Sequence, residues 1–176
     1  MNKRSKIIWM IVFILMFVCA IGLDQYTKQL VITRLQGKGA YVLIENVLEL
    51  QFYSNTGIAW SMLEGQQIFI LFVGVIFLSV MLFFILKLPE HKKYRILYFV
   101  GGLLAGGAAG NMVDRIRLGY VVDFISFTLI DFPIFNVADI CIVISIFLLA
   151  ILFLFVYKED DLAFLTFRQK KFRQVK

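Results

Sequence analysis

The stretch FNVADICIVISIFLLAILFLFVY, residues 135–157, decides the fold class. From Val137 to Tyr157 it contains one carboxylate, Asp139, and no basic residue. Such a long apolar segment is typical of a transmembrane helix, because about 20 helical residues cross the hydrocarbon core of a bilayer. Asn136 and Asp139 at its opening have the spacing of a helix N-cap and an N3 acid. On spacing alone, this pair is either a cap at the membrane surface or part of a functional site.

The whole chain has the composition of a membrane protein. Of its 176 residues, 61% are hydrophobic and 17% are charged, whereas soluble domains have about 45–50% apolar and about 25% charged residues. Windows without charge predict four spans within one integral membrane domain, residues 1–176. The predicted spans are residues 7–23, 68–86, 96–113 and 137–157. The predicted fold class is therefore an all-α membrane protein, a four-transmembrane-helix bundle.

The distribution of basic residues predicts the orientation of the bundle. Of the 18 Lys and Arg residues, 13 precede the first span, lie between the second and third, or follow the fourth. By the positive-inside rule both termini and the basic tail 158–176 are cytoplasmic, and loops 24–67 and 114–136 face outward. The basic flanks account for most of the net charge of +6 and predict contact with membrane lipid, not with nucleic acid. A cleaved signal peptide at residues 7–23 is disfavoured, because its removal would leave three spans.

Acidic residues gather at the outward ends of the spans. The outward aspartates are Asp24, Asp114, Asp123, Asp131 and Asp139. The middle of the spans, by contrast, carries as polar groups only Ser79, Cys141 and Ser145. Transporters and proton pumps usually need ionisable residues or broken helices there. The pattern therefore disfavours translocation and predicts that the chemistry occurs at the outward interface.

Loop 24–67 contains two local patterns. Asp24 and Lys28 stand four residues apart with the acid first, which predicts a helical ion pair in which Lys28 offsets an acid at the end of the first span. A direct chemical role for this pair stays open. Residues 41–53 alternate between apolar and polar, which predicts a small amphipathic sheet on the bilayer surface. Asn55 and Gly57 follow it, and Asn55 is either a turn residue or a ligand-binding one.

The third span has a stripe of small residues. Gly102, Gly106 and Gly110 recur at four-residue spacing. In lipid such a stripe lets helix backbones approach closely, so we expect a packing role. This packing would fix Asn111 and its neighbours Asp114 and Arg115 at the outer face.

Several kinds of catalytic site are disfavoured by the residues available. The single histidine, His91, falls in a predicted cytoplasmic loop, so no His-dependent triad can form at the outward side, and no Cys/His zinc pattern exists. Two catalytic hypotheses remain: an outward serine (Ser54, Ser61 or Ser126) with Lys28, or two aspartates that activate a water. Composition alone does not choose among the five aspartates. A third hypothesis is a non-enzymatic membrane protein that holds a lipidated partner.

Five motifs together resemble the lipoprotein signal peptidase family, bacterial signal peptidase II. They are DQYTK (24–28), NTGIAW (55–60), GNMVDR (110–115), VVDF (121–124) and FNVAD (135–139). Each motif alone is weak, but the five stand in the family's order on a chain of the family's size.

The resemblance implies an aspartic endopeptidase in the bacterial inner (cytoplasmic) membrane. Such an enzyme removes signal peptides from diacylglyceryl-modified prolipoproteins, cutting just before the lipidated cysteine, without metal or cofactor. The implied catalytic pair is Asp123 and Asp139. The positions implied to shape the substrate cleft are Asn55, Asn111, Arg115 and Asn136, and those implied to support it are Asp24, Lys28, Gly57, Gly110, Asp114 and Ala138. A β-cradle on the outer leaflet and inhibition by globomycin are also implied.

Overall fold

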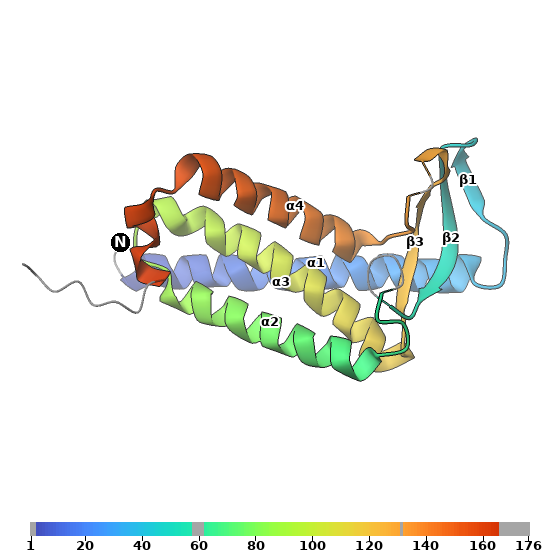
Figure 1. The fold of residues 1–176 in the computed structure, drawn as a ribbon, viewed down its shortest axis with the longest axis horizontal. Helices are drawn as coiled ribbons and strands as arrows, with labels where there is room; N and C mark the ends of the chain where they lie inside the picture. Colours follow the sequence, from blue (N-terminus) through green and yellow to red (C-terminus); the bar gives the residue numbers. More distant parts are fainter. Residues whose placement is uncertain (1–2, 58–61, 131, 166–176) are drawn as a thin grey trace, which may run out of the picture.

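The computed structural model describes residues 3–57, 62–130 and 132–165. It contains helices α1 (Lys3–Leu35), α2 (Gln67–Lys87), α3 (Arg95–Leu118) and α4 (Val137–Ile151), and a π-helical segment, Leu152–Val156, continues α4. Figure 1 shows the four helices side by side, with a small sheet across one end. All four are long and apolar enough to cross a membrane, so the predicted four-helix membrane bundle is confirmed. The predictions for Ser61, Asp131 and the end of the tail lie outside the described residues.

Helix α3 is the centre of the bundle and packs against α1, α4 and α2. Its glycines make this possible. A Cβ atom at Gly102 would lie 2.5 Å from the Phe13 carbonyl oxygen of α1, and one at Gly106 would lie 2.7 Å from that of Phe17. A Cβ atom at Gly107 would lie 2.6 Å from the Ala138 carbonyl oxygen of α4. The predicted close packing of the small-residue stripe is therefore confirmed.

Helix α1 is longer than the sequence indicated. The prediction placed an outward loop from residue 24, but the helix continues to Leu35, and that part of the prediction is wrong. No glycine or proline interrupts residues 24–35, and Val31 is buried against the sheet residues Val122 and Phe124. The helix is followed by Gly37, whose φ of +74° suits glycine. Because Asp24 lies in mid-helix, the expected cost of an acid at a helix C-terminus does not apply.

The sheet has three antiparallel strands, in the order β1 (Tyr41–Ile44), β2 (Leu48–Asn55) and β3 (Val121–Phe127). The strand pattern predicted over residues 41–53 is confirmed as the β1–β2 hairpin. Strand β3 was not predicted, because residues 114–136 were assigned as loop. The third helix also extends further than predicted, since α3 runs on to Leu118. The register pairs Tyr53 with Asp123 and Asn55 with Val121, which brings Asn55 close to Asp123.

The opposite end of the bundle is closed by aromatic contacts. The rings of Tyr94 and Tyr157 stack with centroids 5.6 Å apart. The Tyr157 hydroxyl donates to the Lys93 carbonyl oxygen at 2.9 Å, and Lys93 pairs with Asp161. The start of α1 lies at this same end (Figure 1). Both ends of the described chain therefore lie on one side of the bundle, and their cytoplasmic location stays a prediction.

Candidate active site

The polar residues predicted for the site converge where the helices meet the sheet. Helix α1 contributes Asp24 and Lys28, and strand β2 contributes Asn55. The others come from α3 (Asn111, Asp114 and Arg115), from β3 (Asp123) and from the start of α4 (Asn136 and Asp139). Hydrogen bonds and ion pairs connect all of them, as described below.

Asn136 is the N-cap of α4 and also part of the site. Its side chain accepts from the Asp139 backbone N–H at 3.0 Å, and the Asp139 carboxylate accepts from the Asn136 N–H at 3.1 Å. This is the predicted capping box. The Asn136 amide also donates to Asp123 Oδ1 at 2.6 Å and to Asn111 Oδ1 at 3.0 Å. The cap is therefore confirmed, and the same side chain contacts two other predicted site residues, while its role in a functional site stays a prediction.

Asp123 is buried, with 2% of its surface exposed. Its second oxygen, Oδ2, accepts from the Asn55 amide at 2.8 Å. Asn55 is held in turn by the Gly57 N–H, which donates to its Oδ1 at 2.9 Å. Burial raises the pKa of Asp123 to about 7; the nearby charge of Asp139 adds to the rise, while the amides of Asn55 and Asn136 oppose it. A proton is therefore available on this carboxyl near neutral pH.

Asp139 is joined to the same network through Asn111. The Asn111 amide donates to Asp139 Oδ1 at 2.8 Å. Asn111 Oδ1 accepts from Lys28 Nζ at 2.8 Å and from the Asn136 amide, which fixes which side of the amide faces Asp139. Asn111 and Asn136 thus link Asp123 and Asp139, which we call the aspartate pair. Two carboxylates in such a setting can exchange protons with a water and a substrate.

Lys28 lies beneath this network with 2% of its side chain exposed. Its ammonium group is 2.8 Å from Asp24 Oδ2, 2.9 Å from Asp114 Oδ2 and bonded to Asn111. The predicted ion pair of Asp24 and Lys28 is therefore present. With all three of its N–H donors directed at oxygens, Lys28 is badly placed to act as the base of a serine nucleophile.

Arg115, Gly110 and Ala138 make close contacts with segments around the aspartate pair. Arg115 donates to the Gly57 carbonyl oxygen at 2.7 Å and to the Asn111 carbonyl oxygen at 3.2 Å, so it ties the chain after β2 to α3. A Cβ atom at Gly110 would lie 2.7 Å from Asp24 Oδ2. Ala138 is buried, and its N–H donates to Asp24 Oδ1 at 3.0 Å. Through these contacts the predicted supporting residues connect the helices and the chain segments that surround the aspartate pair.

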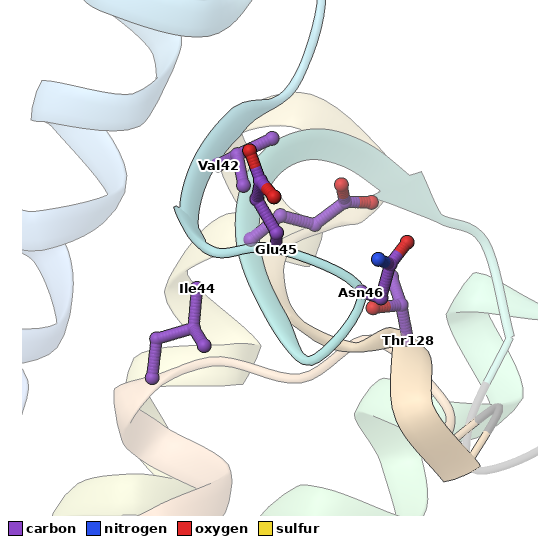
Figure 2. Close-up of a pocket in the computed structure, with 6 residues that line it drawn as sticks. Val42, Ile44, Glu45, Asn46 and Thr128 are labelled. Atoms are coloured by element: carbon purple, nitrogen blue, oxygen red, sulfur yellow. The ribbon is translucent and has the colours of Figure 1, made fainter.

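An open pocket lies at the tip of the β1–β2 hairpin, away from these residues. Figure 2 shows it between the hairpin turn and Thr128. Its lining residues are Val42, Ile44, Glu45, Asn46, Glu49 and Thr128. None of them belongs to the predicted site. Among the described residues, no group of three or more His, Cys, Asp or Glu side chains could hold a metal ion. Catalysis without a metal stays a prediction.

Comparison with known proteins shows the family to which the chain belongs. The family described as signal peptidase (SPase) II matches residues 16–155. The chain belongs to the signal peptidase II family. It is therefore an aspartic-type peptidase, and its four long apolar helices make it a multi-pass membrane protein.

Individual relatives of this signal peptidase II cover most of the chain. A lipoprotein signal peptidase of Caldanaerobacter subterraneus subsp. tengcongensis is 40% identical over 76% of this chain and 89% of its own length. That of Enterococcus faecalis is 39% identical over 78% of this chain and 84% of its own length. A solved bacterial membrane enzyme structure, 32% identical, covers 82% of this chain and 94% of its own, with a TM-score of 0.72. The fold and the family are thus supported independently.

Proposed function

We propose that this member of the family removes signal peptides from diacylglyceryl-modified prolipoproteins and cuts just before the lipidated cysteine. The related chains are named lipoprotein signal peptidases. The observation that carries the proposal is the aspartate pair, in which Asn136 donates to Asp123 and shares the capping box with Asp139. Two carboxylates held close together by amide donors suit hydrolysis of a peptide bond by an activated water.

In the proposed mechanism, Asp123 and Asp139 share one proton. The ionised carboxylate takes a proton from water as the water oxygen bonds to the carbonyl carbon of the scissile peptide. The protonated carboxyl then gives its proton to the amide nitrogen as the carbon–nitrogen bond breaks. Asn55, Asn111 and Asn136 hold the carboxylates in place by the contacts described above, so little reorganisation is needed during the reaction. No cofactor takes part.

The depth of the site suits a lipidated substrate. Asp139 lies in the first turn of a helix apolar enough to cross a membrane. It is the third residue of that helix, which at helical rise places it about 3–4.5 Å along the axis. If the connections from α1 to α2 and from α3 to α4 face outward, the aspartate pair lies at the extracytoplasmic face of the inner membrane. A prolipoprotein whose acyl chains are held in the outer leaflet then brings its scissile bond to the same level.

Cleavage of matched precursors tests this proposal. The purified protein is incubated with a diacylglyceryl-modified prolipoprotein and with the same precursor lacking the lipid, and the products are identified by mass spectrometry. We expect cleavage immediately before the lipidated cysteine, little cleavage of the unmodified precursor, and inhibition by globomycin. Equal cleavage of both precursors would contradict lipid recognition, and no cleavage of either would contradict the proposed function.

A further inference from the structure

Gln25 was not among the predicted site residues, yet it contacts the supporting carboxylates directly. It follows Asp24 in α1 and is half-buried. Its amide nitrogen donates to Asp114 Oδ1 at 2.7 Å and lies 3.2 Å from both Asp24 Oδ2 and the Gly110 carbonyl oxygen. Its amide oxygen accepts from Arg117 at 3.3 Å. These contacts define the orientation of the amide, because only its nitrogen can donate to carboxylates.

Each of the two carboxylates that Gln25 contacts accepts a hydrogen bond from the backbone next to one member of the aspartate pair. Asp24 Oδ1 accepts from the N–H of Ala138, the residue before Asp139, at 3.0 Å. Asp114 Oδ2 accepts from the N–H of Val122, the residue before Asp123, at 3.1 Å. Each carboxylate therefore fixes the backbone next to one member of the aspartate pair. The distance between Asp24 and Asp114 is in this way coupled to the distance between β3 and the start of α4.

The surroundings of Asp24 and Asp114 explain why a residue besides Lys28 is needed to join these two carboxylates. Both carboxylates are buried, and both pair with the single ammonium group of Lys28. The three donors of one ammonium group cannot satisfy all the lone pairs of two carboxylates in this poorly solvated place, where unsatisfied acceptors are costly. Gln25 supplies neutral donors to both carboxylates. In the described part of the chain, Lys28 and Gln25 are the side chains that bond to both.

From these contacts we propose that Gln25 is a positioning residue of the peptidase, which together with Lys28 joins Asp24 to Asp114 and so holds β3 and α4 at the spacing that the aspartate pair requires. This role rests on the proposed function. Gln25 bonds to the supporting carboxylates and to neither member of the pair. We therefore expect it to affect the chemical step and to leave substrate binding largely unchanged.

Gln25→Met tests this role, since it keeps the length of the side chain and removes the donors. The matched control is Gln29→Met, one turn further along α1, where the side chain is exposed. With the lipidated prolipoprotein as substrate, we expect kcat of Gln25→Met to fall about 10-fold with KM within about twofold of wild type, because small misplacements of catalytic groups mainly slow the reaction. Gln29→Met should keep the wild-type values.

A second variant, Gln25→Glu, separates positioning from space filling. It has the shape of glutamine but places a third carboxylate beside Asp24 and Asp114, so its kcat should be lower than that of Gln25→Met. All rates are divided by the amount of monodisperse enzyme, which removes any effect of the variants on yield. Should Gln25→Met fail to fold, Gln25→Asn, which keeps the amide on a shorter side chain, should show an intermediate kcat.

Three outcomes would overturn the role of Gln25. They are an unaltered kcat in the Gln25 variants, a loss of folded protein with an unchanged kcat per folded enzyme, and a raised KM with an unchanged kcat. In each of these cases the wild type remains active and the proposed function stands. An inactive wild type would instead contradict the proposed function and, with it, the role of Gln25.

Discussion

Asp123 and Asp139 are both held by amide side chains, but they are placed differently. Asp123 lies in a strand and has 2% of its surface exposed, whereas Asp139 opens a helix and is half-buried. Burial raises the pKa of Asp123 to about 7. A carboxyl group with such a pKa can both give and take a proton under physiological conditions.

The raised pKa of Asp123 predicts how activity depends on pH. Below about pH 7 this carboxyl holds a proton, and as the pH rises through that value the proton is lost. Because the proposed mechanism needs one shared proton on the aspartate pair, we expect kcat/KM to fall on the alkaline side of about pH 7. The measurement is the rate of prolipoprotein cleavage from acid to alkaline pH, with samples returned to neutral pH to show that the enzyme is intact. A rate that stays constant across neutral and alkaline pH would contradict this prediction.

Single residues also show what the sequence could predict. The spacing of Asn136 and Asp139 predicted the capping box, because both of its bonds are local to one turn of helix. The bond from Asn136 to Asp123 was not derivable from spacing, since it depends on the path of β3. The resemblance to the family supplied Asp123, whereas the residues alone left five aspartates open. Gln25 was missed because its contacts join α1 to a residue 89 positions away in α3.

At the level of secondary structure, the contact between α1 and α3 positions the site. Helix α3 presents Gly102 and Gly106 to α1, and further along the same helix Asn111 and Asp114 contact Lys28 of α1. Loss of close contact along the glycines should therefore affect stability and, through Lys28, the site.

Gly106→Ala should destabilise the protein. Its new methyl group would lie 2.7 Å from Ala20 Cβ and from the Phe17 carbonyl oxygen, so the two helices must separate. Overpacking of this kind costs about 1–3 kcal/mol. The control is Gly22→Ala in α1, where a Cβ atom would meet nothing within 4 Å. Thermal unfolding in detergent measures both variants, and equal melting temperatures for the two would contradict the packing argument.

The boundaries of the elements were harder to predict than the elements themselves. The spans near 68–86 and 96–113 match α2 and the first part of α3. They were predictable because a long stretch of sequence without charged residues is itself the property that a membrane-spanning helix needs. The continuation of α1 to Leu35 was missed because charged residues were interpreted as the end of the helix. In the structure, the pairing of Asp24 with Lys28 lets α1 continue through these charges. Strand β3 was missed because it pairs with a strand far away in the chain.

For the whole molecule, the distribution of charge predicts the orientation in the membrane. The sheet and the start of α4 lie at one end of the bundle, and the start of α1 and the end of α4 lie at the other (Figure 1). In the sequence, 13 of the 18 basic residues belong to the N-terminal segment, to the region that joins the second and third spans, or to the segment after the fourth. By the positive-inside rule the side of these segments is cytoplasmic.

Cysteine labelling tests this orientation. In a protein whose Cys19 and Cys141 are replaced by alanine, Lys38→Cys and Lys92→Cys place single thiols at exposed positions near opposite ends of the bundle. In sealed right-side-out vesicles, a membrane-impermeant maleimide should label Lys38→Cys directly. It should label Lys92→Cys only after the vesicles are opened. The reverse pattern would contradict the proposed position of the site.

The most direct test of the central claim is prolipoprotein cleavage by Asp123→Asn and Asp139→Asn beside the wild type. Each change keeps the size of the side chain and removes its ability to transfer a proton. A general acid or base contributes about 10²–10⁴-fold to the rate, so both variants should lose turnover to that extent. Binding of the substrate should be retained, and Glu159→Gln at an exposed position should behave as wild type. Near-normal cleavage by both aspartate variants would contradict catalysis by the pair.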